Sequence, residues 1–235
     1  MKLSVVVPVF NERKTLVEVL RRVAATPYEK EIVVVDDGSS DGTRELLDSV
    51  VEDPGAFGLS GVTLRAFFHG ENMGKGAALR TGFTQVGGDV VLIQDADLEY
   101  DPRDYAAMLQ PIVEGKADVV FGNRFHGGSH RVLYFWHYVG NRVVTTMANM
   151  ITNLNLADIE VGYKVFRRDV LDRIRLRSRR FGCEPELTVK VAKLGCRVYE
   201  VPIAYHGRTY AEGKKITWKD GLAALYSLLR FRFRD

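Results

Sequence analysis

The sequence predicts an α/β protein with a doubly wound, mostly parallel sheet. Two observations lead to this fold class. In residues 2–125, short runs rich in β-branched residues alternate with segments whose apolar residues recur at helical spacing. Polar turns rich in aspartate and glycine follow several of these runs, which is where doubly wound sheets bind ligands. A chain of 235 residues suits one such domain and can bury a core without disulfides.

The alternation defines the elements of the first half. The run KLSVVVPV at residues 2–9 predicts a buried strand, and the apolar spacing after it predicts a helix over residues 14–25. Further strands are predicted at residues 31–35, 62–68, 89–93 and 118–121, and further helices from near Asp41, at 75–86 and at 103–114.

After residue 124 the alternation stops. The remaining elements are predicted as one or two helices at residues 131–154, strands at 163–166 and 197–201, helices at 184–194 and 218–231, and a polar loop or lid at 205–217. No repeat, low-complexity tract or linker interrupts the chain, so we expect a single domain.

The charge balance and the cysteines limit the partners. Lys and Arg outnumber Asp and Glu by only 33 to 30, which is weak evidence for an anionic partner, and we expect no nucleic acid. The arginines gather in residues 167–180 and 230–234, a pattern that fits an anionic-membrane surface or a solvated face. Cys183 and Cys196 form no disulfide framework or metal-binding spacing, so we expect reduced thiols in a cytoplasmic protein.

Three polar clusters directly follow predicted strands. They are PVFNE at residues 8–12, DDGSSDG at 36–42 and QDADLE at 94–99. Because the carboxyl ends of parallel strands meet at one edge of a sheet, we expect the three clusters to surround one ligand.

The third cluster has the chemistry of a metal site. Asp95 and Asp97 are one residue apart, just past a strand, and Glu99 follows at the same alternation. Carboxylates are preferred ligands of Mg²⁺ and Mn²⁺, and such an ion neutralises a leaving pyrophosphate. A lone pair of this kind is common by chance, and an acidic turn without metal is the alternative.

The other clusters narrow the class of ligand. Asp37 can accept hydrogen bonds from a base or a ribose, or it caps the next helix, although Ser40 or Asp41 suits a cap better. PVFNE stands where a dinucleotide fold needs GxGxxG, which argues against an NAD enzyme. Lys75 in NMGKGAA is placed to reach a phosphate, but the spacing is not that of a P-loop ATPase.

Four motifs occur in order at sensible spacing: VVVPVFNE, VVVDDGSSDGT, NMGKGAALRTGF and QDADLEYDP. Together they resemble the inverting GT-A glycosyltransferases of family 2, and within it the dolichol-phosphate mannose and glucose synthases and their bacterial polyprenyl-phosphate relatives. The resemblance implies a Rossmann-like, nucleotide-sugar-binding part at about 1–125, an acceptor-binding part at about 126–217 and an amphipathic C-terminal helix at about 218–235.

The resemblance also implies a donor site. The residues that would bind the nucleoside are Pro8, Phe10, Glu12, Val35 and Asp37. Those that would bind the rest of the donor are Lys75, Asp95, Ala96, Arg208 and Lys215, the last two from a loop that closes over the pyrophosphate. The metal would be bound by Asp95, Asp97 and Glu99; relatives often have Gln at the last position, so Glu99 adds a charge that bears on metal preference.

The acceptor side is implied more loosely. Residues 122–124 read GNR where the family has GSR, and Arg124 would face the acceptor phosphate, with Arg131 as a second candidate. Residues 157–164 resemble a segment with an acidic residue beside the reacting centre, which makes Asp158 a candidate base or orienting group. A helix cap is the alternative for Asp158. Residues 181–186 resemble the acceptor-side segment that follows.

The implied reaction is displacement with inversion, moving a sugar, mannose or glucose, from a GDP- or UDP-sugar to a polyprenyl phosphate. A phosphate acceptor, whose second pKa is about 6, needs no strong base, so the protein would contribute positioning and charge compensation. A hydroxyl acceptor on a soluble molecule or glycan is the first alternative and would need Asp158 as a base. A non-catalytic nucleotide-sugar or lipid-phosphate binding module is the second, although the intact DAD motif argues against it.

Membrane contact is expected at the end of the chain. The apolar residues at helical or alternating positions there are Trp218, Leu222, Leu225, Leu229, Phe231 and Phe233. With the neighbouring arginines they suit an interfacial helix, or else a helix packed on the domain with a basic tail. No uninterrupted apolar segment approaches the length of a spanning helix, so we expect peripheral binding to the cytoplasmic membrane face, alone or through a membrane-protein partner.

Overall fold

The first half of the chain alternates strands and helices as the sequence predicts. The computed structural model describes the chain apart from residues 126, 128–129, 133, 181, 214–217 and 235. The strands of this half are β1 (Leu3–Val9), β2 (Lys30–Asp36), β3 (Thr63–Phe68), β4 (Val90–Ile93) and β5 (Val119–Asn123). The helices are α1 (Leu16–Ala24), α2 (Thr43–Glu52), α3 (Lys75–Phe83) and α4 (Tyr105–Val113), with 3₁₀ turns at Pro54–Phe57 and Pro102–Asp104.

The second half adds two strands and a set of helices. They are α5 (Phe135–Thr152), β6 (Lys164–Arg167), α6 (Arg168–Leu171), α7 (Cys183–Lys193), β7 (Val198–Pro202) and α8 (Trp218–Phe233). Residues 131–154 thus contain one long helix, and the predicted loop contains a 3₁₀ turn at Tyr210–Glu212.

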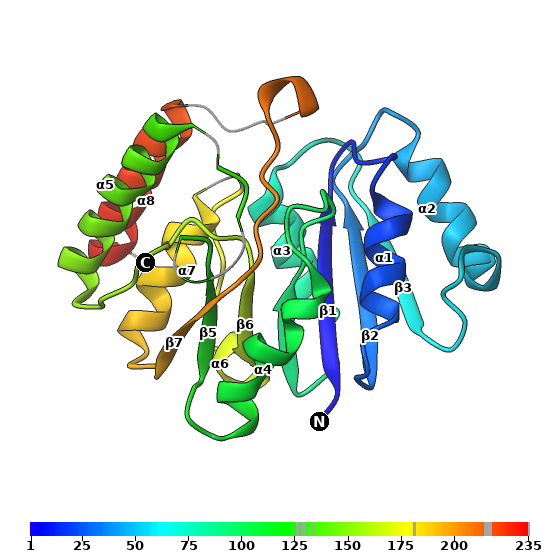
Figure 1. The fold of residues 1–235 in the computed structure, drawn as a ribbon, viewed down its shortest axis with the longest axis horizontal. Coiled ribbons are helices and arrows are strands. Elements are labelled where there is room, and N and C mark those ends of the chain that lie inside the picture. The colour runs from blue at the N-terminus through cyan, green and yellow to red at the C-terminus, as the bar shows by residue number, and fades with distance from the viewer. Residues whose placement is uncertain (126, 128–129, 133, 181, 214–217, 235) are drawn as a thin grey trace.

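The strands of the described residues form one seven-stranded sheet in the order β3-β2-β1-β4-β6-β5-β7. All neighbours pair in parallel except β6, which runs antiparallel to both β4 and β5. In Figure 1, α1 and α4 lie in front of the sheet and α3 and α7 behind it. The predicted doubly wound, mostly parallel sheet is therefore confirmed.

The core follows from the β-branched runs. Val5, Val6 and Val7 of β1 are completely buried because helices cover both faces of this strand. Burial of each such side chain contributes roughly 1.5–3 kcal/mol. Gly82 lets α3 approach the strand closely, since a Cβ there would overlap the side chain of Val6.

The helices α5 and α8 pack on each other and on α7 at the β7 end of the sheet (Figure 1). The inner face of α8 contains Ala224, Leu228 and Phe231, so the prediction that Phe231 belongs to an interfacial face is wrong: its side chain is 1% exposed. Leu225 is half-buried, and the side chain of Trp218 lies outside the described residues. Among the helices of the described residues, none is long and apolar enough to cross a bilayer.

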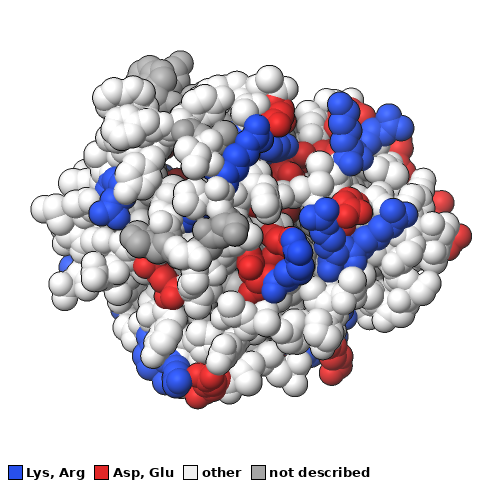
Figure 2. Space-filling model, in the orientation of Figure 1, with Lys and Arg blue, Asp and Glu red and all other residues white. Residues whose placement is uncertain are grey.

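The outer faces of α5 and α8 keep apolar side chains in contact with solvent. On α5 these include Phe135 and Trp136, which are 66% and 77% exposed. On α8 the exposed apolar residues are Leu222, Tyr226, Leu229 and Phe233. Figure 2 shows few charged side chains at the left edge of the molecule, where the two helices lie.

The direction of β6 decides what reaches the functional edge of the sheet. β1, β2, β4 and β5 all end at that edge, whereas the antiparallel β6 begins there. The segment before β6, residues 158–163, is consequently delivered to the same edge as the three polar clusters.

Candidate active site

An arginine joins acidic side chains from two strand ends. Glu12 follows β1, and Asp97 and Glu99 follow β4. The guanidinium group of Arg208 donates hydrogen bonds to all three carboxylates, at 3.1 Å to Glu12, 3.1 Å to Asp97 and 3.3 Å to Glu99. The main-chain N–H of Arg208 also donates to Glu99, at 3.0 Å. Residues nearly 200 positions apart are thereby brought together around one cation.

This cluster holds more negative charge than its cations neutralise. Burial and the carboxylates of Asp95 and Glu99 raise the pKa of Asp97 to about 7, although Arg208 acts in the opposite direction. The turn that carries the carboxylates is strained, because Leu98 has a φ of 63°, a region that side chains other than glycine rarely adopt. Such local strain is typical of functional sites.

Lys75 links the turn after β4 to α7 in the second half of the chain. This lysine opens α3, and its ammonium group contacts Asp95 at 2.8 Å and Glu184 at 3.1 Å. Burial by itself lowers the pKa of Lys75, but the two carboxylates raise it well above its usual value, so the lysine stays charged.

Arg124 and Asp158 form a buried ion pair at the end of β5. Arg124 donates through Nε and Nη2 to the two oxygens of Asp158, at 2.6 and 2.7 Å, and Asn141 donates to one of them. Burial raises the pKa of Asp158, but Arg124 opposes this and holds it below its usual value. A fully buried carboxylate with both oxygens bonded suits the orienting role better than proton abstraction.

Both carboxylate oxygens of Asp37 are hydrogen-bonded within the protein. One of its oxygens contacts Nδ1 of His69 at 2.7 Å and accepts from the N–H of Met73, and the other accepts from the N–H of Gly74 at 2.7 Å. It therefore ties the end of β2 to the start of α3. A helix cap on α2 is not its role: the turn before that helix is closed by Asp41, which accepts from the N–H of Thr43.

The glycines of NMGKG pack against the segment that precedes α7. A Cβ on Gly74 or Gly76 would overlap the carbonyl groups of Arg179 and Ser178, respectively, so both glycines make room for the segment that precedes α7. This segment is held further by a hydrogen bond from the N–H of Ala77 to the carbonyl of Arg179.

The remaining predicted donor residues line the same strand ends. Pro8 and Phe10 are half-buried at and beyond the end of β1. Val35 is fully buried, with its side chain next to the position that a Cβ on Gly82 of α3 would fill, so only its main chain faces the edge. Ala96 is also buried, and its carbonyl accepts from the hydroxyl of Thr15 at 2.6 Å.

Arg131 holds the loop that carries Arg208. Its Nη1 donates to the carbonyl of Gly207 and to Glu212, the latter at 2.8 Å. The ring of His137 on α5 contacts the hydroxyl of Tyr210, which anchors the same loop. Lys215, also predicted for the donor, lies outside the described residues.

The residues present suit a hard divalent cation by their chemistry. Asp95, Asp97 and Glu99 offer carboxylate oxygens that the local cations neutralise incompletely. Among the described residues, however, no three side chains of His, Cys, Asp or Glu are already arranged to hold a metal ion. Arg208 forms ion pairs with Glu12, Asp97 and Glu99 and supplies positive charge to these carboxylates.

Three further residues complete the site and were not singled out individually from the sequence. Glu184 anchors Lys75. Tyr205 donates its hydroxyl to Glu99 at 3.1 Å, while its ring lies under the guanidinium group of Arg124, so it joins the two halves of the site. Glu200 accepts from the N–H groups of Ala157 and Asp158 and fixes that turn. A charged residue in the middle of the predicted strand 197–201 is the signal that could have revealed Glu200.

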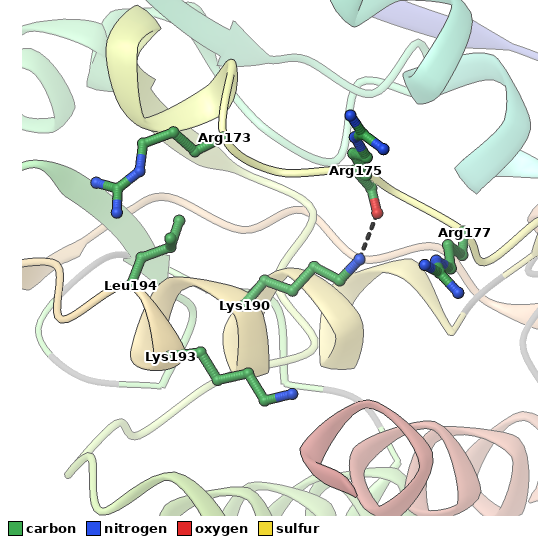
Figure 3. A pocket seen from close by; sticks show the side chains of 6 residues that line it. All are labelled: Arg173, Arg175, Arg177, Lys190, Lys193 and Leu194. Atoms are coloured by element: carbon green, nitrogen blue, oxygen red, sulfur yellow. Dashed lines mark hydrogen bonds between the residues drawn. The ribbon is translucent and has the colours of Figure 1, made fainter. Parts of the chain in front are cut away.

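The arginine-rich segment before α7 forms a separate pocket of about 140 Å³, shown in Figure 3. Its lining residues are Arg173, Arg175, Arg177, Lys190, Lys193 and Leu194. The guanidinium groups of the three arginines point away from one another in Figure 3. Earlier in the segment, Arg167 and Arg168 pair with Asp169 and Asp172. This arrangement is closer to a solvated face than to a single phosphate site.

The order of the strands in the sheet and the site at their carboxyl ends are those of the GT-A fold. The crystal structure of glucosyl-3-phosphoglycerate synthase from Mycobacterium tuberculosis, in complex with Mn²⁺, UDP and glucosyl-3-phosphoglycerate, matches with a TM-score of 0.72. It covers 99% of this chain and 80% of its own, at 19% identity, a likeness that concerns the fold.

The sequence then assigns the family. The model of glycosyl transferase family 2 matches residues 4–175, and the chain belongs to this family. It is 31% identical to undecaprenyl-phosphate mannosyltransferase from Micrococcus luteus, over 91% of this chain and 87% of that protein. It is also 31% identical to polyprenol monophosphomannose synthase from Mycolicibacterium smegmatis, over 89% and 79%. With glycosyltransferase AglJ from Haloferax volcanii the identity is 32%, and the chain spans 63% of that relative's length.

Proposed function

We propose that this glycosyltransferase moves a hexose, mannose or glucose, from a GDP- or UDP-sugar to a polyprenyl phosphate with inversion. The observation that carries the proposal is the state of Arg124. Asp158 holds its Nε and Nη2, while its other terminal nitrogen, Nη1, donates no hydrogen bond within the described residues. Arg124 therefore keeps donors for a phosphate acceptor beside the donor side of the site, to which Tyr205 connects it. The two relatives that are an undecaprenyl-phosphate mannosyltransferase and a polyprenol monophosphomannose synthase support the same acceptor class.

The chain's own residues would then divide the work. Lys75 and Arg208 hold the donor pyrophosphate, and Arg124, oriented by Asp158, holds the acceptor phosphate. Asp95, Asp97 and Glu99 would bind Mg²⁺ or Mn²⁺, which neutralises charge on the leaving nucleoside diphosphate. Arg208 pairs with Glu12 and Asp97, and a divalent cation bound to these carboxylates would reduce their hold on it, so that its guanidinium group would be available to the pyrophosphate.

The exposed apolar faces of α5 and α8 favour a lipid-linked acceptor over a soluble one. An apolar face with Trp and Phe next to arginines is typical of helices that lie in a membrane interface. We therefore propose that this edge of the molecule rests on the cytoplasmic membrane surface, alone or with a membrane-protein partner, and presents the site to the lipid headgroup.

Donor turnover tests the proposal. The protein is incubated with Mg²⁺ or Mn²⁺, a panel of GDP- and UDP-sugars and a short polyprenyl phosphate, and nucleoside diphosphate and lipid-linked sugar are measured. Acceptor-dependent release that Asp97→Ala abolishes, and that Asp48→Ala on the exposed face of α2 leaves intact, supports it. Release without acceptor dependence redirects the search to hydroxyl acceptors. Absence of turnover and of metal-dependent donor binding leaves a binding module.

A further inference from the structure

Glu160 has a carboxyl group without a partner. Its Oε1 is shielded from solvent and makes no hydrogen bond, and no ion pair to this side chain is present among the described residues. Asp36 is the other described residue with such an atom, but its second oxygen accepts from the N–H of Ser39. A buried polar atom without a partner costs about 1–3 kcal/mol in a protein, so its presence at a site edge calls for a ligand.

The position of Glu160 places it between the two halves of the site. Two residues before it, Asp158 pairs with Arg124. Two residues after it, a Cβ on Gly162 would overlap the carboxylate of Asp95 and the ammonium group of Lys75. Glu160 thus lies on a short turn that runs from the acceptor cation to the donor carboxylate.

The turn is held rigidly, so the exposed part of Glu160 is presented in a defined place. The buried ammonium group of Lys164 donates to the carbonyls of Ile159 and Val161, the residues on either side of Glu160. The residue as a whole is only half-buried, and a ligand at the edge of the sheet can reach it without unfolding.

The charge state of this carboxyl group restricts what it can bind. The charged groups that act on it are Glu184, Lys164, Arg124 and Asp158. Burial and the carboxylate of Glu184 outweigh the two cations and raise the pKa of Glu160 to about 8. A carboxyl group that keeps its proton at neutral pH donates one hydrogen bond and accepts others, which is the complement of an alcohol.

We propose that Glu160 binds a hydroxyl group of the transferred sugar and thereby helps to select the donor. This inference rests on the proposed transfer function. The other parts of the substrates have cationic partners: Lys75 and Arg208 for the pyrophosphate, and Arg124 for the acceptor. The sugar lies between them, where the turn of Glu160 passes, and its hydroxyl groups are neutral donors and acceptors.

The test pairs changes in the protein with changes in the sugar. Wild type, Glu160→Ala and Glu160→Gln are compared on the accepted donor and on deoxy analogues that lack one hydroxyl group each. We expect Glu160→Ala to lower kcat/KM about tenfold, as loss of one hydrogen bond predicts. One deoxy donor should lower wild-type kcat/KM by a similar factor and cause no further loss in Glu160→Ala. Glu160→Gln, whose amide also donates and accepts, should retain most of the activity.

A matched control is Glu45→Ala, which removes an exposed glutamate from α2. If every deoxy donor reduces wild type and Glu160→Ala by the same factors, Glu160 does not bind the sugar. If wild type transfers no sugar, the proposed function fails. Each protein is then titrated with a nucleotide-sugar and, separately, with the corresponding free nucleotide, and the two affinities are compared. Extra affinity from the sugar that disappears in Glu160→Ala then still supports the role of Glu160. Equal affinity of the variant and wild type, or no donor binding at all, overturns it.

Discussion

Asp37 illustrates how much of the site depends on single carboxylates. It accepts from the main-chain N–H groups of Met73 and Gly74 and contacts His69, so the NMGKG turn has no other anchor of this kind to β2 in the described residues. Because both of its carboxylate oxygens are already hydrogen-bonded within the protein, Asp37 has few acceptor positions left for a ligand. We therefore propose that Asp37 supports the donor site by fixing the main chain of the NMGKG turn.

We expect Asp37→Ala to lower the free energy of unfolding by about 1–3 kcal/mol, because two N–H groups lose their acceptor where water has little access. Urea denaturation followed by circular dichroism measures this. Asp48→Ala, an exposed aspartate on α2, is the control and should change stability by no more than about 0.5 kcal/mol. Equal stability of the two variants would show that the turn holds without Asp37.

Glu160 predicts a pH dependence of stability. Its pKa is about 8 in the folded chain and near 4.5 when unfolded, so the folded state binds the extra proton between these values. Stability is therefore fully present below about pH 4.5 and is lost as pH rises through 8. Glu160→Gln should remove this component, so its unfolding free energy should fall less than that of wild type between pH 5 and 8.5. Parallel pH profiles of the two proteins would contradict the raised pKa.

At the level of elements, the loop from Tyr205 to Glu212 is a bridge across the site. Tyr205 and Arg208 contact the turn after β4, whereas Tyr210 and Glu212 contact α5 and Arg131. The loop thus connects the carboxylates after β4 to α5, the helix at the proposed membrane edge. Its central residue, Arg208, pairs with Asp97 and Glu99, two of the carboxylates that we propose bind the divalent cation.

Arg208→Ala should therefore tighten Mn²⁺ binding in the absence of donor, by about tenfold or more, because a competing cation near three carboxylates is removed. The same variant should transfer sugar more slowly, since the pyrophosphate loses a cation. Calorimetric titration with Mn²⁺ measures the first effect and donor turnover the second. Arg103→Ala, which removes an exposed arginine paired with Asp101, is the control. Weaker Mn²⁺ binding in Arg208→Ala would show that Arg208 supports the metal site and does not occupy it.

For the whole molecule, the arrangement of α5 and α8 gives one edge of the domain an apolar surface. Trp136 and Phe135 are its exposed aromatic members at the start of α5. We expect the double substitution of these residues by Ser to reduce binding to anionic lipid vesicles at least about tenfold. Co-sedimentation measures it, with Val113→Ser, an equally exposed apolar residue of α4, as the control. Unchanged sedimentation would place membrane contact elsewhere.

The sequence by itself determined the fold class and the meeting of the polar strand ends at one edge of the sheet. Runs of β-branched residues and helical spacing are local properties, so the strands and helices of residues 2–125 could be placed to within a few residues. Parallel strands bring their ends to one edge by rule, which is why Glu12, Asp97 and Glu99 could be expected together.

Only the tertiary structure decided what surrounds Arg124 and Glu160. Nothing in the residues of β6 specifies that it inserts antiparallel between β4 and β5, because that choice depends on long-range pairing. Yet this reversal brings Asp158 to Arg124 and leaves Glu160 without a partner. The same applies to α8, where Leu225 and Leu229 share one predicted face but only Leu229 is exposed, since packing against α5 and α7 selects the buried face. Local patterns predict elements, whereas the environment of each side chain is set by neighbours distant in the sequence.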